Sequence, residues 1–220
     1  MISYRKLIPC IYIAGGKAIK WFNDREVLAD NVVELAKHYS DRGADELLIF
    51  DLSDSDDDHE ASLNLLRQIH NVISIPMVAG GNIKRMEDVK KLIYAGCAKV
   101  VLNFSKENNI KLLEEVSRRF GKERMMISIS DLREFTENQD LIEKYADTVL
   151  ALDTVENEIA EISQISIVLH TDENRSENVL KLLGEAAVSG LCGAYVSSLE
   201  NDLHTFKGNL RRSQNSGKHI

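Results

Sequence analysis

The chain has 220 residues, of which 44% are hydrophobic and 28% charged, a composition that is ordinary for a globular protein with a sizeable core. Its formal net charge of −8 argues against nucleic acid as the main partner, because binding a phosphate backbone needs clustered Lys and Arg. A small anionic ligand stays compatible with this charge, and no apolar run approaches the length of a membrane span.

The first apolar run follows two basic residues, Arg5 and Lys6, and extends over Leu7–Gly16. This pattern imitates a short signal peptide. Because a regular succession of strands and helices follows it directly, we interpret the run as the first strand of the fold.

Short apolar runs then alternate with amphipathic stretches along the chain. The strands are predicted at Leu7–Ile13, Glu46–Phe50, Pro76–Val78, Lys99–Leu102, Met125–Ile129, Thr148–Leu152, Ile165–Leu169 and Ala194–Val196. The helices are predicted at Val32–Ser40, Glu60–His70, Met86–Ala95, Ile110–Phe120, Leu141–Tyr145, Val155–Ile162, Ser176–Val188 and Leu203–Leu210. This alternation predicts an α/β fold, a (βα)8 TIM barrel, with an open doubly wound sheet as the alternative.

An internal repeat favours the barrel over the open sheet. The octapeptide ADELLIFD at Ala44–Asp51 returns as ADTVLALD at Ala146–Asp153, nearly half the chain later. The strand-opening segments Ile75–Gly81 and Ile165–His170 form a second pair. We therefore expect two half-barrels within one domain over residues 1–210. Residues 211–220 are polar and are expected to form a flexible tail or a linker to a further domain.

The three cysteines, Cys10, Cys97 and Cys192, are odd in number, widely spaced and free of any CxxC pair. This usage predicts a reduced, cytoplasmic protein rather than a disulfide scaffold or a zinc site. The acidic run Asp54–Glu60 lacks the central glycine and the spacing of a calcium loop. We read it as a solvated helix start, and we expect no metal and no cofactor.

Candidate functional residues follow the third and fourth predicted strands, where a barrel keeps its active site. Gly80, Gly81 and Asn82 form a turn in which backbone amides can approach a phosphate. Asn103 and Ser105 end the neighbouring strand and strengthen this interpretation. The alternative is a tight turn without a ligand.

Several segments together resemble one known family. They are Leu7–Ile11, Gly16–Lys20, Ala44–Leu47, Phe50–Leu52, Ala79–Gly81, Gly96, Lys99–Val100 and Asn103. The pattern is similar to the cyclase subunit of imidazole glycerol phosphate synthase and to the related ribotide isomerase of histidine biosynthesis. The Ile-Pro-Cys opening favours the cyclase. The resemblance is continuous from Lys6 to Phe120 and is traceable to Leu210. It implies a two-fold barrel with one phosphate site in each half.

The resemblance also implies two catalytic aspartates, at the ends of the first and fifth strands. Those positions hold Tyr12 and Ser130 here, and neither hydroxyl can act as a carboxylate at neutral pH. Asp131 is one residue away, but a shift of one residue along a strand points a side chain to the other face. We expect Asp131 to cap a helix or form a turn.

The second half departs from the family as well. The glycine turn expected after the seventh strand is replaced by His170-Thr171-Asp172-Glu173, whose negative charges would repel a phosphate. Ser198 is a remnant that still matches a family serine. The resemblance further implies a ring of charges at the N-terminal mouth, facing a glutaminase partner. Lys6, Glu46 and Lys99 match three members of this ring, and Thr148 replaces the fourth.

Two hypotheses follow. In the first, the chain is a degenerate histidine-biosynthesis barrel that binds a small phosphorylated metabolite as a regulatory or scaffold domain. It would work with a glutaminase-like or other histidine-pathway protein, or as the N-terminal part of a longer pathway enzyme. In the second, it is an active lyase or isomerase on a phosphoribosyl intermediate. That enzyme would use a rearranged set of Asp51, Asp131, Asp153 and Lys20, of which Lys20 matches the family's mobile first loop.

Overall fold

The computed structural model describes residues 5–152, 156–171, 188–193, 196–197 and 207. Eight parallel strands form a closed barrel, because the last strand pairs with the first. The strands are β1 (Lys6–Ala14), β4 (Leu47–Asp51), β5 (Met77–Gly80), β6 (Lys99–Asn103), β7 (Met125–Ile129), β8 (Thr148–Ala151), β9 (Ser166–Thr171) and β10 (Val188–Gly193). The predicted (βα)8 barrel is confirmed. The repeated octapeptides coincide with β4 and β8, four strands apart in the barrel order.

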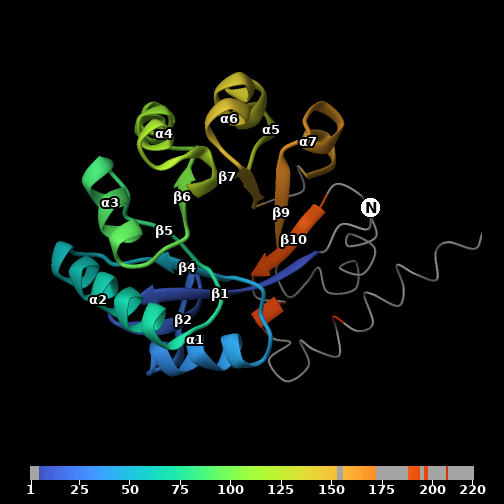
Figure 1. Cartoon of the computed structure of the whole chain (residues 1–220). Coiled ribbons are helices and arrows are strands. Elements are labelled where there is room, and N and C mark those ends of the chain that lie inside the picture. Colours follow the sequence, from blue (N-terminus) through green and yellow to red (C-terminus); the bar gives the residue numbers. More distant parts are fainter. Residues whose placement is uncertain (1–4, 153–155, 172–187, 194–195, 198–206, 208–220) are drawn as a thin grey trace, which may run out of the picture.

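Helices lie outside the strands and cover the barrel (Figure 1). They are α1 (Val32–Asp41), α2 (Asp56–Val72), α3 (Met86–Tyr94), α4 (Glu107–Phe120), α5 (Leu132–Thr136), α6 (Gln139–Tyr145) and α7 (Glu156–Ile162), with a 3-10 turn at Lys122–Arg124. The acidic run opens α2, where the Ser55 hydroxyl accepts the Asp58 amide at 3.1 Å and three aspartates face the positive end of the helix dipole. Among the described residues, no helix is both long and apolar enough to cross a bilayer.

Alternation along the strands separates two layers of core. The odd-numbered side chains of β1, such as Leu7 and Ile11, pack with the helices. Ile8, Cys10 and Tyr12 join an inner cluster with residues of the other strands. A period of two in a parallel barrel produces this division, since successive side chains point to opposite faces.

A β-hairpin follows β1 and was not anticipated. The resemblance matched Lys20 to the family's mobile first loop, whereas the chain forms β2 (Lys17–Trp21) and β3 (Asp24–Ala29) here. β2 continues antiparallel along β1, with Tyr12 opposite Ile19. Lys20 therefore lies on a strand, beside Asp24 and Glu26 of the same hairpin at 3.9 and 3.8 Å.

The position predicted for the eighth strand was wrong. The expectation was Ala194–Val196, with a helix running to Val188, but the strand is Val188–Gly193. Its two glycines have low strand propensity, so the segment reads as a helix end. Gly190 suits this position because a Cβ there would lie only 3.2 Å from the Cβ of Lys6 on β1, a closer contact than most Cβ atoms make. The close approach of β10 to β1 favours glycine in this strand, and the periodicity of the sequence gives no sign of that approach.

The fold makes a testable demand at Gly81, which has a φ of +94°, because a Cβ there would lie 2.1 Å from the carbonyl oxygen of Asp51. Gly16 also has a positive φ, +74°, but no heavy atom within 4 Å of that position. Gly16→Ala should lower the free energy of unfolding by about 1–2 kcal/mol through backbone strain alone. Gly81→Ala should cost roughly 1–3 kcal/mol more, because the neighbouring strand must move. Urea denaturation of both variants measures the difference, and equal losses would contradict the close packing described here.

Candidate functional site

A pocket of about 450 Å³ opens at the carboxyl ends of the strands, on the side of β4, β5 and β6. This is the face at which (βα)8 barrels place their active sites. The pocket is lined mainly by residues at or directly after the ends of these strands, and by residues of the β2–β3 hairpin. The lining residues are Phe22, Arg25, Phe50, Asp51, Leu52, Ser53, Gly81, Asn82, Ile83, Val101, Asn103, Lys106, Asn109, Ser128 and Leu152.

The turn after β5 is built from two consecutive left-handed residues, Gly81 with φ +94° and Asn82 with φ +51°. Asn82 holds the turn in place, since its side-chain amide donates to the Ser53 carbonyl at 2.9 Å. Such turns leave backbone N–H groups available to an anion. Gly80, also predicted for this site, ends β5 and packs against Val101 rather than lining the pocket.

The segment after β6 borders the same pocket through Asn103, Lys106 and Asn109. The Asn103 side-chain oxygen accepts the Ser105 amide at 2.9 Å and the Ser105 hydroxyl at 2.6 Å. Ser105 is therefore used in the turn and is exposed outside the lining. Asn109, in the first turn of α4, donates to the Asn103 carbonyl at 3.0 Å. Its own Oδ1 is buried without a hydrogen-bond partner among the described residues.

Two cations at this pocket were missed by the sequence analysis. Arg25 comes from β3 and donates to the Leu52 carbonyl at 3.4 Å and to Asp54 at 3.3 Å. Lys106 precedes α4 and lines the pocket beside Asn109. Lys106 had a sequence signal, because it follows a predicted strand end. Arg25 had none, because only the hairpin brings it to this face.

Asp51 ends β4 and is 4% exposed. Its carboxylate accepts the Ser53 amide at 3.0 Å and the Ser53 hydroxyl, and its second oxygen contacts His59 Nδ1 on α2. All of these partners belong to the adjacent loop and helix. The carboxylate is thus occupied in shaping the loop beside Gly81.

Tyr12 fills the centre of the barrel mouth. It is 1% exposed, stacks on Phe50 with ring centroids 5.7 Å apart, and meets Trp21 and Phe22 edge-on at 5.3 and 4.7 Å. Its hydroxyl lies 2.8 Å from Nε2 of His170. Burial raises the pKa of Tyr12 far above its usual value, and charge on Cys10 and Cys192 raises it further. The phenol therefore stays protonated at neutral pH and offers no base to the pocket.

The fifth-strand positions lie apart from the pocket lining. Ser130 is exposed after β7, and its amide donates to the Glu134 carboxylate at 3.0 Å. Asp131 caps α5 by accepting the Arg133 amide at 2.8 Å. Hydrogen bonds from the Arg133 side chain and amide lower the pKa of the Asp131 carboxyl. Asp153, Asp172, Glu173 and Ser198, which the sequence analysis also named, lie outside the described residues.

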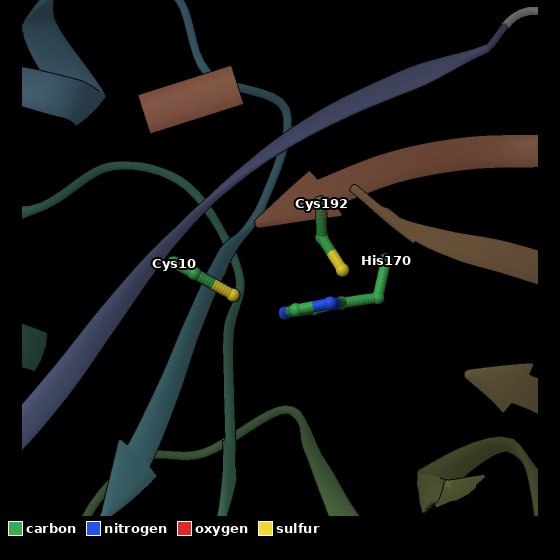
Figure 2. Close-up of side chains that lie close together, drawn as sticks. All are labelled: Cys10, His170 and Cys192. Atoms are coloured by element: carbon green, nitrogen blue, oxygen red, sulfur yellow. The ribbon is translucent and has the colours of Figure 1, made fainter. Parts of the chain in front are cut away.

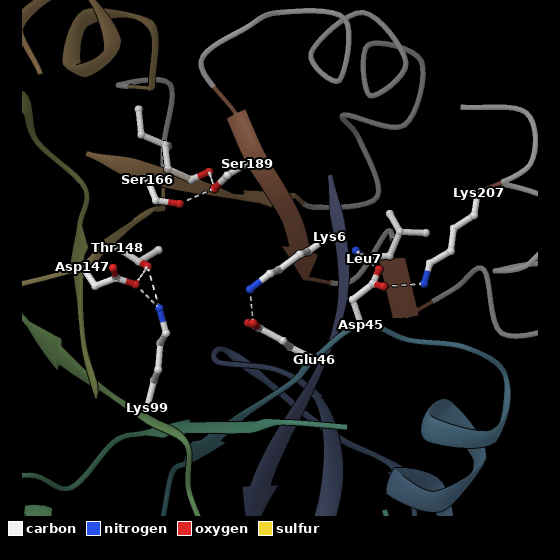
Figure 3. A network of polar contacts seen from close by, with 11 residues as sticks. Lys6, Leu7, Asp45, Glu46, Lys99, Asp147, Thr148, Ser166, Ser189 and Lys207 are labelled. Carbon is white, nitrogen blue, oxygen red and sulfur yellow. Dashed lines mark hydrogen bonds and ion pairs between the residues drawn. The ribbon is translucent and has the colours of Figure 1, made fainter. Parts of the chain in front are cut away.

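At the opposite mouth, the predicted charge cluster divides into two ion pairs (Figure 3). Lys6 contacts Glu46. Lys99 contacts Asp147, and its amine also donates to Thr148 at 3.1 Å. Asp147 was absent from the prediction because it precedes β8 by one residue, where no strand pattern marks it. Each lysine at this mouth thus has a carboxylate partner.

Comparisons with known proteins agree with this architecture. The family described as "Histidine biosynthesis protein" matches residues 6–172. Imidazole glycerol phosphate synthase subunit HisF of Exiguobacterium sibiricum is 36% identical over 131 residues, covering 59% of this chain and 52% of that protein. The protein of the same name from Methanocaldococcus jannaschii is 32% identical over 152 residues, covering 68% and 55%. The chain thus spans about half the length of the curated relatives it matches. It belongs to the histidine biosynthesis protein family.

Proposed function

We propose that this barrel binds a small phosphorylated metabolite of the histidine pathway at the first-half pocket, as a regulatory or scaffold domain, without cyclising it. The buried oxygen of Asn109 is the observation that carries the proposal. A buried acceptor without a partner among the described residues costs free energy, and a ligand hydroxyl at the pocket would satisfy it.

The proposed ligand joins a phosphate to a hydroxyl-bearing group, as a ribose phosphate does. Backbone amides of Gly81 and Asn82 suit the phosphate, and Arg25 and Lys106 add positive charge to the same lining. The ionised oxygens of a phosphate only accept hydrogen bonds and cannot satisfy Asn109 Oδ1. A sugar hydroxyl can donate to it, and Asn109 therefore supports a ligand that carries hydroxyl groups beside its phosphate.

The absence of cyclisation is inferred from the two positions at which the resembled family carries aspartates. Tyr12 is buried among aromatic rings, and Ser130 is an aliphatic hydroxyl. The described carboxylates of the alternative set are engaged elsewhere, Asp51 with Ser53 and His59, and Asp131 with Arg133. This engagement disfavours an acid–base pair assembled from them.

The wider setting is part of the same proposal. The similar proteins are named as subunits, which supports association with another histidine-pathway protein, glutaminase-like or fused. The ion-paired N-terminal mouth is the proposed face for it. We further propose one barrel domain over residues 1–210 with a linker at residues 211–220, acting in the cytoplasm, where thiols stay reduced.

Ribose 5-phosphate titrated into labelled protein should shift the backbone amide resonances of Gly81, Asn82 and Asn103, because the open amides and pocket cations lie there. Two-dimensional NMR measures the shifts. Changes confined to residues 170–173 and 198, with residues 80–82 and 103 unchanged, would move the site to the other half of the barrel.

Lys106→Ala should weaken that binding about five- to tenfold, as expected for one charged contact to a phosphate. Lys111→Ala is the matched control, because Lys111 lies in the helix that Lys106 precedes, pairs with Glu107 at 2.8 Å and is absent from the pocket lining. Calorimetric titration compares the two. An equal effect of both variants would indicate nonspecific attraction.

No cyclase turnover should be detectable with ammonia as the nitrogen donor. Each lost carboxylate removes a proton-transfer role typically worth about 10²–10⁴-fold in rate. The assay follows product formation beside an active family member. A rate within about tenfold of that enzyme would overturn the noncatalytic role and leave the binding proposal to the titration above.

A further inference from the structure

Three metal-ligating side chains meet inside the barrel, away from the first-half pocket. Cys10 on β1, His170 on β9 and Cys192 on β10 each offer one ligand atom, and these atoms all lie within 4.8 Å of one another. Figure 2 shows the two sulfur atoms and the imidazole directed toward a common point. All three residues are buried, at 3%, 5% and 0% exposure.

Strand register explains this meeting. Cys192 stands opposite His170 in the β9–β10 pair and opposite Ile8 in the β1–β10 pair. Cys10 lies two residues beyond Ile8, so its side chain points to the same inner face. The wide spacing of the cysteines in the sequence was the argument against a zinc site. That argument does not apply, because closure of the barrel makes the first and last strands neighbours.

The chemistry of the set is selective. Two thiolates with an imidazole form a soft donor set that suits zinc. Zinc–sulfur bonds of about 2.3 Å in a tetrahedron place the two sulfurs about 3.8 Å apart. The observed upper limit of 4.8 Å is within a small side-chain adjustment of that distance.

The surroundings also suit a metal site. The Tyr12 hydroxyl lies 2.8 Å from Nε2 of His170. A hydrogen bond of this kind orients the ring of a ligating histidine, and with Nε2 so engaged, Nδ1 would be the nitrogen that binds the ion. Cys10 and Cys192 belong to the same buried cluster inside the barrel. A divalent cation between them would balance the charge of two buried thiolates.

We propose that Cys10, His170 and Cys192 bind a zinc ion as its three protein ligands, with a water molecule in the fourth position, and that this ion holds the closing seam of the barrel together. The ion would join β1, β9 and β10, where the first barrel strand pairs with the last. Because the ligands are buried, the metal enters as the barrel folds, and its binding energy contributes to the stability of the closed state.

Refolding the full chain with Co(II), a spectroscopic substitute for zinc, tests this assignment. One equivalent should bind and produce thiolate-to-cobalt charge-transfer absorption with the intense visible bands of a tetrahedral ion, and zinc should abolish both. Chain refolded with zinc should retain one ion through gel filtration and should unfold at a higher temperature than chain refolded with chelator.

The variants Cys10→Ser and Cys192→Ser should lose the charge-transfer absorption and the thermal shift. Cys97→Ser is the matched control, since Cys97 is also buried but packs in the outer core. It should retain both signals. If the serine variants fail to fold, the cobalt spectrum of the wild-type protein still tests whether thiolates bind the ion. Absence of thiolate-to-cobalt absorption in folded wild-type protein, or its loss in Cys97→Ser alone, would show that the three side chains only fill the core.

Discussion

The pairing of β1 with β10 is the contact on which the rest of the molecule depends. Lys6 through Pro9 align with Gly190 through Gly193, although the other six barrel strands lie between these segments in the sequence. Closure removes the open edges of the parallel sheet. It also brings His170 and Cys192 beside Tyr12 and Cys10. Glycine at position 190 permits the close approach of β10 to β1, although glycine lowers the strand propensity of β10. A strand that is weak by its local sequence thus closes the barrel.

Closure also determines where a ligand can sit. Tyr12, Phe50, Trp21 and Phe22 fill the middle of the mouth with aromatic rings, and the Tyr12 hydroxyl spends its hydrogen bond on His170. The space that is left lies over β4, β5 and β6. Among the described residues, the two halves of the repeat thus differ at the mouth, because their side chains differ although their strands correspond.

The sequence was sufficient for features that depend on short-range patterns. Apolar periodicity located seven of the barrel strands, and the rule that function follows strand ends identified Gly81, Asn82 and Asn103. Arg25, Asn109 and the thiol–imidazole group were out of reach, because a hairpin, a buried unsatisfied oxygen and a strand seam exist only in three dimensions. β10 was misplaced for the same reason, since its glycines are justified by a distant neighbour and not by local propensity.

The hairpin has a consequence for how the chain is made. The edge of β1 that faces away from β4 is divided, with Lys6–Pro9 assigned to β10 and Tyr12–Ala14 to β2. A ribosome needs roughly 10–40 s at about 5–20 residues per second to synthesise the stretch between β1 and β10. The hairpin is available almost at once and covers half of that exposed edge. With Tyr12–Ala14 already paired, only the Lys6–Pro9 part of this edge stays open to pairing with another nascent chain until β10 is made.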